Sequence, residues 1–155
     1  MMNRQRIREQ IYMNAAVDQA KLSTCRSTNV GAVIVLDNRI VTTGYNGVAA
    51  GMPHCNEYGD WLDDKTKHLE FADKTEIHAE MNALMNALDT GSKVRGGVCY
   101  TTVQPCWNCI KHLHRAGITE IFYKESYWRY TEDVVNEQQE TFKIRVTKFK
   151  NDEEE

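Results

Sequence analysis

The residues that could do chemistry fall in two short stretches, His78-Ala79-Glu80 and Pro105-Cys106-Trp107-Asn108-Cys109. One histidine and two cysteines can hold a zinc ion, and three protein ligands leave a tetrahedral zinc with one position for water. Structural zinc sites are closed by four protein ligands, whereas catalytic sites keep one position open. Glu80 could move protons beside that position. The pattern therefore predicts metal-assisted proton-transfer chemistry.

Both stretches fall where helices are expected to begin. His78 starts one expected helix, and Pro105 places Cys106 and Cys109 in the first turn of another. Helix N-termini carry partial positive charge, which favours the thiolate form that zinc requires. The two cysteines are three apart and share a helix face, so one metal can take both. Glu80 lies two residues after His78 and therefore on a different face of the helix. We expect its carboxylate to lie beside the metal rather than to coordinate it.

Two other interpretations of the cysteine pair remain open. A Cys-x-x-Cys pair that follows a strand and opens a helix also fits a redox dithiol. A structural zinc would need a fourth ligand, which Cys99, Cys55, His54 or His68 could supply. The joint occurrence of both motifs at helix starts favours catalytic zinc. Among the other cysteines and histidines, Cys25 and Cys99 are expected to be packed thiols. The pair His54-Cys55 is expected to lie in a loop without metal, and His112 and His114 are expected at the surface.

Length and composition are those of an ordinary globular protein. The 155 residues are 41% hydrophobic and 26% charged, with a net charge of −3. Long nucleic acid is disfavoured as a partner, because proteins that bind it usually carry a basic excess. No apolar stretch is long enough to span a membrane, and Glu9-Gln10 interrupts the place where a signal peptide needs an apolar run. Five cysteines, an odd number, argue against a disulfide framework, so we expect a cytoplasmic protein with reduced thiols.

Hydrophobic periodicity predicts an α/β protein. Residues 30–36 and 39–44 are typical of a hairpin that turns at Asp37-Asn38. A hairpin followed by alternating helices and strands predicts a mixed sheet with helices on both faces. Residues 52–76 are polar and lack a clear period, so they are expected to form a long insert with one short helix. We expect helices at 3–21, 78–88, 106–116 and 131–140, further strands at 98–103, 118–123 and 142–146, a single domain over 1–150, and a disordered acidic tail at 151–155.

The wider pattern resembles the deoxycytidylate (dCMP) deaminase family over about residues 5 to 125. His-x-Glu followed by Pro-Cys-x-x-Cys is the signature of zinc deaminases in general. The Gly44-Tyr45-Asn46-Gly47 loop and the long insert after it point to the dCMP branch. The other segments that carry the resemblance are Cys25-Arg26-Ser27, residues 30–35, Pro53-His54-Cys55 and residues 78–84.

The resemblance implies a three-layer α/β/α cytidine-deaminase-like fold with a mixed five-stranded sheet. It implies hydrolysis of dCMP to dUMP and ammonia by an enzyme that is commonly a homo-hexamer. It assigns the Zn²⁺ ion to His78, Cys106 and Cys109. Zinc-bound water is then expected to attack C4 of the cytosine ring, with Glu80 as the proton shuttle.

The resemblance also implies contacts to the substrate. Asn46 is expected to hydrogen-bond the deoxyribose 3′-hydroxyl, although an asparagine before glycine also suits a turn. The backbone N–H of Ala79 is expected to face the base. Tyr127 is the expected substrate-side tyrosine, with Trp128 and Tyr130 as competing choices.

The phosphate of the substrate needs a cationic partner. Arg26 with Ser27 is the candidate, because a guanidinium fork suits a phosphate dianion. The competing interpretation is a solvated surface arginine.

The family is commonly activated by dCTP and inhibited by dTTP, each carried with Mg²⁺. By resemblance, the regulatory pocket would lie between the Gly44–Gly47 loop and the insert. A carboxylate there could meet magnesium or its waters. The candidate regulatory residues are Gly47, Gly51, Glu57 and Trp61.

Three alternatives to dCMP deamination stay open. A tRNA adenosine deaminase shares both zinc motifs but would need a basic face and a pocket for a flipped base. A free cytidine deaminase would need no phosphate site. A zinc-stabilised binding module, which belongs to a different functional class, would have no turnover.

Overall fold

A single mixed sheet forms the centre of the molecule in the computed structural model, which describes residues 3–151. The sheet has five strands in the order β2-β1-β3-β4-β5. β1 pairs antiparallel with β2 and β3, while β3, β4 and β5 run parallel. The predicted mixed five-stranded sheet is therefore confirmed. The strands are β1 (Gly31–Leu36), β2 (Arg39–Tyr45), β3 (Val98–Val103), β4 (Glu120–Glu125) and β5 (Arg145–Lys148).

The hairpin of β1 and β2 forms where the sequence predicts it. Asp37 and Asn38 both have positive φ, at 52° and 61°. Two such residues make a turn whose twist matches that of the flanking strands, and aspartate and asparagine tolerate this conformation better than most residues. The turn residues therefore set the register next to the turn, and an irregularity between Ile34 and Val35 shifts the pairing further along the strands.

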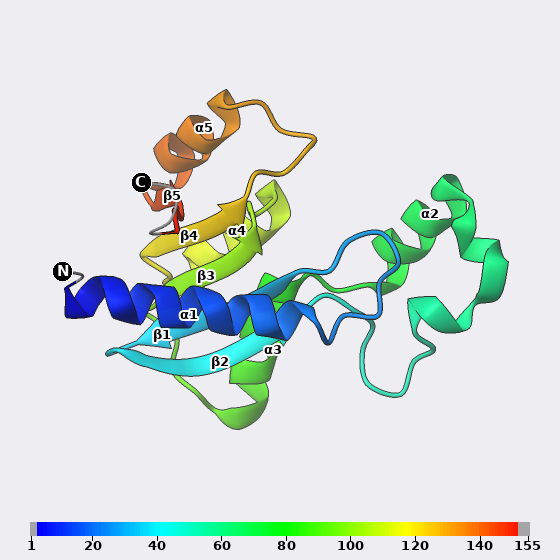
Figure 1. Cartoon of the computed structure of the whole chain (residues 1–155), viewed down its shortest axis with the longest axis horizontal. Coiled ribbons are helices and arrows are strands. Elements are labelled where there is room, and N and C mark those ends of the chain that lie inside the picture. The colour runs from blue at the N-terminus through cyan, green and yellow to red at the C-terminus, as the bar shows by residue number, and fades with distance from the viewer. Residues whose placement is uncertain (1–2, 152–155) are drawn as a thin grey trace.

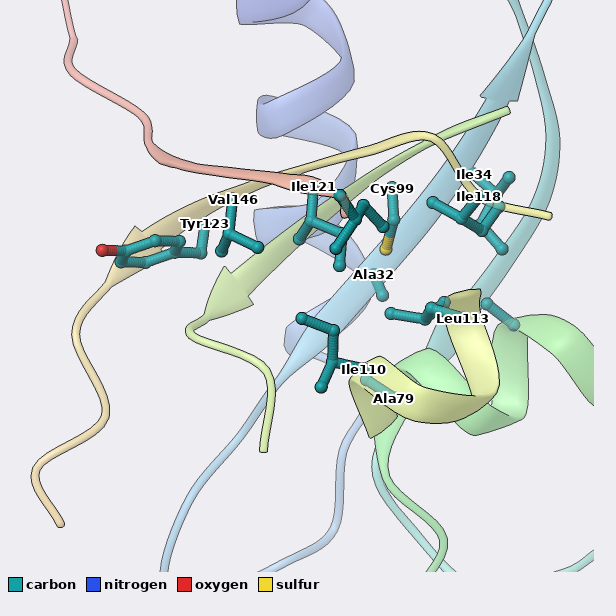
Figure 2. Packing of buried hydrophobic residues seen from close by; sticks show 12 residues of the cluster. Ala32, Ile34, Ala79, Cys99, Ile110, Leu113, Ile118, Ile121, Tyr123 and Val146 are labelled. Carbon is teal, nitrogen blue, oxygen red and sulfur yellow. The ribbon is translucent and has the colours of Figure 1, made fainter. Parts of the chain in front are cut away.

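Helices cover both faces of the sheet, so the fold has three layers (Figure 1). Successive β1 side chains alternate between the faces, with Val33 under α1 and Ile34 on the opposite side. α1 lies on one face, and side chains of α3, α4 and α5 pack into the core of the other. Figure 2 shows Ile110 and Leu113 of α4 packed against strand residues such as Ile121. These helices are α1 (Arg4–Ala20), α3 (Ala79–Thr90), α4 (Trp107–Arg115) and α5 (Asp133–Phe142).

The C-terminal element boundaries differ from the prediction. The last strand was expected from residue 142, but Phe142 ends α5 and β5 begins at Arg145. Phe142 packs beside Trp107 and His114 of α4, with ring centroids 6.3 and 5.4 Å away. This tertiary contact keeps Phe142, an aromatic residue with good strand propensity, in a helix. The helix ends at Lys143, which has a positive φ of 54°. β4 also begins two residues later than predicted, at Glu120 rather than Ile118.

The insert contains more regular structure than predicted. Two 3₁₀ turns, Cys55–Glu57 and Gly59–Asp63, precede the 11-residue helix α2 (Lys65–Thr75). Asp64 caps this helix by accepting hydrogen bonds from the backbone N–H groups of Thr66 and Lys67. Figure 1 shows the insert standing out from one end of the sheet.

Two other sequence expectations concern the membrane and the tail. Within residues 3–151, no helix is both long and apolar enough to cross a bilayer. Of the predicted acidic tail at 151–155, residues 152–155 lie outside the described part of the chain. The division into one domain over residues 1–150 stays a prediction.

Gly44 lets α3 lie directly against β2. A Cβ atom at this position would lie 2.3 Å from the carbonyl oxygen of Ala79 and 2.4 Å from the backbone nitrogen of Ala83. The hydroxyl of Thr42 adds a hydrogen bond of 2.7 Å to the carbonyl of Ala83. The first turns of α3 are therefore placed by backbone contact with the sheet.

We expect Gly44→Ala to lower the free energy of unfolding by about 1–3 kcal/mol or more, because the methyl group overlaps backbone that cannot move freely. Urea unfolding of the variant and the parent chain measures this difference. Gly47→Ala is the matched control, because its Cβ would meet no atom within 4 Å. Equal stability of all three chains would contradict the close approach of α3.

Candidate metal and active site

His78, Cys106 and Cys109 meet where α3 and α4 begin. His78 is the N-cap of α3 and Cys106 is the N-cap of α4. The Nδ1 atom of His78 lies 3.5 Å from the Sγ of Cys106 and 3.3 Å from the Sγ of Cys109. These three potential ligand atoms all lie within 4.8 Å of one another. The structure thus brings together the three predicted ligands.

Backbone contacts hold both helix starts in place. Ile77, next to His78, forms a two-way backbone bridge with Gly47, with N···O distances of 2.8 and 3.1 Å. At the other helix, the buried Gln138 of α5 donates from Nε2 to the carbonyl of Pro105 at 3.0 Å. The ligands are therefore fixed by the sheet edge and by α5, not only by their own helices.

The spacing of the three donor atoms fits zinc. Zn–N and Zn–S bonds of about 2.1 and 2.3 Å at tetrahedral angles place nitrogen and sulfur about 3.6 Å apart. The distances of 3.3 and 3.5 Å from His78 to the two sulfurs are close to this value. Within residues 3–151 the cluster has three members, which leaves a fourth position for a non-protein ligand.

The contacts within the cluster stabilise the charged forms of Cys106 and His78 and the neutral form of Cys109. The pKa of the Cys106 thiol is lowered to about 4, chiefly by its hydrogen bond with Cys109, with a further contribution from His78. The same arrangement raises the pKa of Cys109. The pKa of His78 is raised to about 9, chiefly by its hydrogen bond with Cys106. The site therefore favours a thiolate, the form in which cysteine binds metal.

Glu80 lies in the first turn of α3 and is 4% exposed. The hydroxyl of Thr101 on β3 donates to its Oε1 at 2.8 Å. Burial raises the pKa of this carboxyl group. Glu80 is absent from the group of clustered ligand atoms, as its helical position predicts. A buried carboxyl with a raised pKa beside an open metal position is suited to carrying a proton.

A cavity of about 330 Å³ opens over these residues. Its volume falls at the lower end of the range for small-molecule sites. Its wall contains His78, Ala79, Glu80 and Cys106, so the cavity reaches the candidate metal position. Ala79 is the first helical residue of α3, and its N–H has no partner within the helix. Further lining residues include Ser27, Asn46, Gln104, Tyr127 and Arg129.

Asn46 lines the cavity and also ties its wall together. Its Oδ1 accepts from the backbone N–H of Val30 at 2.8 Å, and its Nδ2 donates to the carbonyl of Thr28 at 2.7 Å. The side chain therefore has a structural role at the end of β2. An amide oxygen has two acceptor sites, so Oδ1 can accept a second hydrogen bond from a ligand.

Arg26 and Ser27, the predicted phosphate pair, have different surroundings. Ser27 lines the cavity, and Arg26 is not among the lining residues. The Nη1 atom of Arg26 lies 2.8 Å from a carboxylate oxygen of Asp63 in the insert. Arg129, which we did not predict from the sequence, does line the cavity. Its guanidinium carbon lies 4.7 Å from the ring centroid of Trp128.

Tyr127 is the lining residue among the three aromatic candidates after β4. Tyr130 packs edge-on against it with ring centroids 4.9 Å apart, and its hydroxyl accepts from the backbone N–H of Trp107 at 3.1 Å. Trp128 is 77% exposed. Gln104 was not singled out in the sequence, although it directly precedes Pro105. It is buried, accepts from the backbone N–H of Tyr127 at 3.3 Å, and its Nε2 has no hydrogen-bond partner in residues 3–151.

Three of the candidate regulatory residues, Gly47, Gly51 and Glu57, are not among the residues that line this cavity. Gly47 pairs with Ile77, and Gly51 has a positive φ of 86°. The carboxylate of Glu57 accepts a hydrogen bond of 3.0 Å from the backbone N–H of His54. Trp61 lies in the second 3₁₀ turn. Their regulatory roles stay a prediction.

The other cysteines and histidines only partly follow the expectations. Cys99 is packed in the core, and His112 and His114 are exposed, as predicted. Cys25 and Cys55 are buried but do not lie among apolar side chains alone. Their sulfurs belong to a second cluster of potential metal ligands, Cys25, Cys55, His68 and Glu76, which the sequence analysis did not predict.

Comparisons with known proteins agree with this geometry. Residues 6–125 match the family model described as the cytidine and deoxycytidylate deaminase zinc-binding region. The deoxycytidylate deaminase of Enterobacteria phage T2 is 35% identical over 137 residues, covering 68% of this chain and 73% of that protein. ComE operon protein 2 of Bacillus subtilis is 38% identical over 118 residues, covering 76% of this chain and 59% of that protein.

The fold comparison gives the same family. The dCMP deaminase of cyanophage S-TIM5, solved in complex with dCMP and dUMP, is 27% identical with a TM-score of 0.75. The match covers 96% of this chain and 100% of that one. The predicted cytidine-deaminase-like fold is confirmed. By its sequence match and by its sheet, helices and ligand cluster, the chain belongs to the cytidine and deoxycytidylate deaminase zinc-binding family.

Proposed function

We propose that this protein hydrolyses dCMP to dUMP and ammonia. The observation that carries the proposal is a cavity whose wall includes His78 and Cys106, two members of the three-ligand cluster, together with a buried carboxyl group, Glu80. An open metal position and a proton carrier are what hydrolysis of an aromatic amine requires. The relatives named deoxycytidylate deaminase support dCMP as the substrate.

Each group of the site has a distinct task in this reaction. Zinc, when bound by His78, Cys106 and Cys109, supplies a water that is nucleophilic at neutral pH. In the reaction as a whole, the C4–N4 bond of the cytosine breaks and a C4–O bond from water replaces it. Glu80 would carry the two protons of that water, one to N3 of the ring and one to the amine, which leaves as ammonia. Thr101 orients the carboxyl group through its hydrogen bond of 2.8 Å.

The substrate is oriented by the remaining cavity wall. The backbone N–H of Ala79, at the start of α3, has no partner within the helix and donates a hydrogen bond to the base. Asn46 accepts a hydrogen bond from the deoxyribose 3′-hydroxyl through the second acceptor site of Oδ1. Tyr127 contributes an aromatic surface to the cavity wall. Gln104 offers an additional donor, because its Nε2 is unpaired within the described chain.

Two arginines are candidates for the phosphate. Arg129 lines the cavity near Tyr127, whereas Arg26 is adjacent to the lining Ser27 but paired with Asp63. Binding through Arg26 would require this ion pair to open or share its charge. We therefore favour Arg129, with Ser27 as a hydroxyl donor, and keep Arg26 as the competing site.

The alternatives are less well supported. A tRNA adenosine deaminase would need a basic face, and the chain carries a net charge of −3. A free cytidine deaminase would not need an arginine at the cavity. A binding module would not need a buried carboxyl group beside an open ligand position.

Regulation and assembly form a further part of the proposal. We propose activation by dCTP and inhibition by dTTP, with Mg²⁺, at residues Gly47, Gly51, Glu57 and Trp61. The likeness of the Gly44–Gly47 loop to the family supports this. A homo-oligomer, expected to be a hexamer, is supported by apolar side chains that α3 exposes, with Met85 at 43% and Leu88 at 75% exposure. Free cysteines at all five positions support a reducing, cytoplasmic location for a single domain over residues 1–150.

Ammonia release by the purified chain tests the proposed function. We expect turnover of dCMP and little or none of cytidine, CMP or a tRNA anticodon stem. Addition of dCTP with Mg²⁺ should raise the rate at low dCMP, and dTTP should lower it. Equal turnover of cytidine would support a free cytidine deaminase. No turnover of any substrate by a folded, zinc-loaded chain would contradict the enzyme and favour the binding module.

The phosphate site is tested by Arg129→Ala against Arg26→Ala. Loss of a charge-assisted contact of about 1.5–3 kcal/mol should raise the KM for dCMP by roughly 10- to 100-fold. The change should be small for deoxycytidine, which has no phosphate. Steady-state kinetics on both substrates measure it. A rise in the KM for dCMP in Arg26→Ala, with the KM of Arg129→Ala unchanged, would assign the phosphate to Arg26 instead.

A further inference from the structure

The chain between β4 and α5 contains a tight turn over residues 127–130. The backbone N–H of Tyr130 donates to the carbonyl of Tyr127 at 2.9 Å, which closes a four-residue turn. Trp128 and Arg129 occupy its two corners. Because Tyr127 and Arg129 both line the cavity, this turn supplies part of the cavity wall.

Both ends of the turn are fastened to the segment that joins β3 to α4. At one end, the backbone N–H of Tyr127 donates to Oε1 of Gln104 at 3.3 Å. At the other end, the hydroxyl oxygen of Tyr130 accepts from the backbone N–H of Trp107 at 3.1 Å. Gln104 and Trp107 lie directly before and after Pro105-Cys106. The two hydrogen bonds therefore flank Cys106, a member of the three-ligand cluster.

These two contacts satisfy groups that the rest of the fold leaves without a partner. Trp107 is the first helical residue of α4, where a backbone N–H has no acceptor within the helix. The hydroxyl of Tyr130 supplies that acceptor. Gln104 is 5% exposed, so its amide is oriented by the protein and not by solvent. Removing either contact would leave a sheltered backbone donor unpaired, which costs more than losing an exposed hydrogen bond.

The position of Arg129 depends on this turn. Its side chain is exposed, and within residues 3–151 no carboxylate forms an ion pair with it, in contrast to Arg26 and Asp63. Its guanidinium group lies over the ring of Trp128, the other corner residue. A long side chain without an ion-pair partner has many rotamers open to it. A fixed backbone turn restricts where its charge can be placed.

We propose that Gln104 and Tyr130 are positioning residues, which hold the turn over residues 127–130 against the start of α4 and thereby hold Arg129 at the cavity for the phosphate of the substrate. Neither side chain has to touch the phosphate for this. The inference rests on the proposed function and deepens it, because it assigns the preference for a nucleotide over a nucleoside to these two contacts. The turn and the start of α4, with Cys106, then behave as one rigid unit.

Tyr130→Phe tests the proposal, because it removes the hydroxyl and keeps the ring that packs against Tyr127. Loss of one hydrogen bond should raise the KM for dCMP about 2- to 10-fold, with kcat changed less than KM. The kcat/KM for deoxycytidine, which has no phosphate, should stay the same. Steady-state kinetics on both substrates, with zinc content measured on each preparation, give these values.

Tyr12→Phe is the matched control. It also removes one tyrosine hydroxyl, which donates to the carbonyl of Asn38 at 2.8 Å, and neither residue lines the cavity. This variant should keep the KM of the parent chain for dCMP. An unchanged KM for dCMP in Tyr130→Phe, or an equal loss of kcat/KM for dCMP and deoxycytidine, would overturn the proposal.

A double-mutant cycle with Arg129→Ala separates positioning from a general structural effect. A residue that acts through Arg129 has no further effect on phosphate binding once Arg129 is gone. Tyr130→Phe or Gln104→Leu added to Arg129→Ala should therefore leave the KM for dCMP at the value of Arg129→Ala alone. Effects that multiply, or an unchanged KM in Arg129→Ala, would overturn the inference.

The same measurements distinguish the two levels of the account. A parent chain that releases ammonia from dCMP, combined with multiplying effects in the cycle, refutes only the positioning role. A folded, zinc-loaded parent chain that releases no ammonia from dCMP refutes the proposed function, and the positioning role with it.

Discussion

The active site depends on the fixed meeting of two helix N-termini. α3 is placed by the close approach of its backbone to Gly44 and by the backbone bridge between Gly47 and Ile77. α4 is placed by the end of β3 and by the hydrogen bond from Gln138 to Pro105. A histidine on one N-cap and a cysteine on the other can then share a metal with a second cysteine one turn later. The charge of both helix starts favours the thiolates that this requires.

Donor number distinguishes the two ligand clusters of this chain. The cluster of His78, Cys106 and Cys109 has three donors, opens into the cavity, and has Glu80 beside it. The cluster that includes Cys55 has four donors, which leaves no position for water on a tetrahedral ion. The three-donor cluster therefore combines an open coordination position with a neighbouring acid, which is the arrangement that hydrolysis requires.

Local sequence patterns predicted what depends on local structure. The hairpin turn at Asp37-Asn38, the helix starts at His78 and Cys106, and the position of Glu80 off the ligand face all follow from residues near one another in the chain. The mixed sheet followed from the order of these elements. The cluster of His78, Cys106 and Cys109 was predictable because the spacing of these residues within each helix start is itself the signature.

Contacts between distant segments were not predictable in the same way. The cluster of Cys25 and Cys55 depends on how the insert folds back over the loop after α1, and the insert has no clear hydrophobic period. Arg129 and Gln104 reach the cavity because of the path of the chain after β3 and β4. The sequence predicts a strand at Phe142, because the packing against α4 that keeps this residue in a helix is a tertiary contact that local sequence does not show. In each case the deciding partner is far away in the sequence.

We propose that Glu80 carries protons for a metal site that it does not help to build. Glu80→Gln tests it most directly, with zinc content and dCMP turnover measured on the same preparation and exposed Glu140→Gln as the control. Loss of a general acid–base group typically lowers kcat by about 10²–10⁴-fold. We predict a loss of this size with unchanged zinc content and unchanged circular dichroism, while Glu140→Gln keeps full activity. Full activity in Glu80→Gln, or loss of the catalytic zinc with it, would contradict the account.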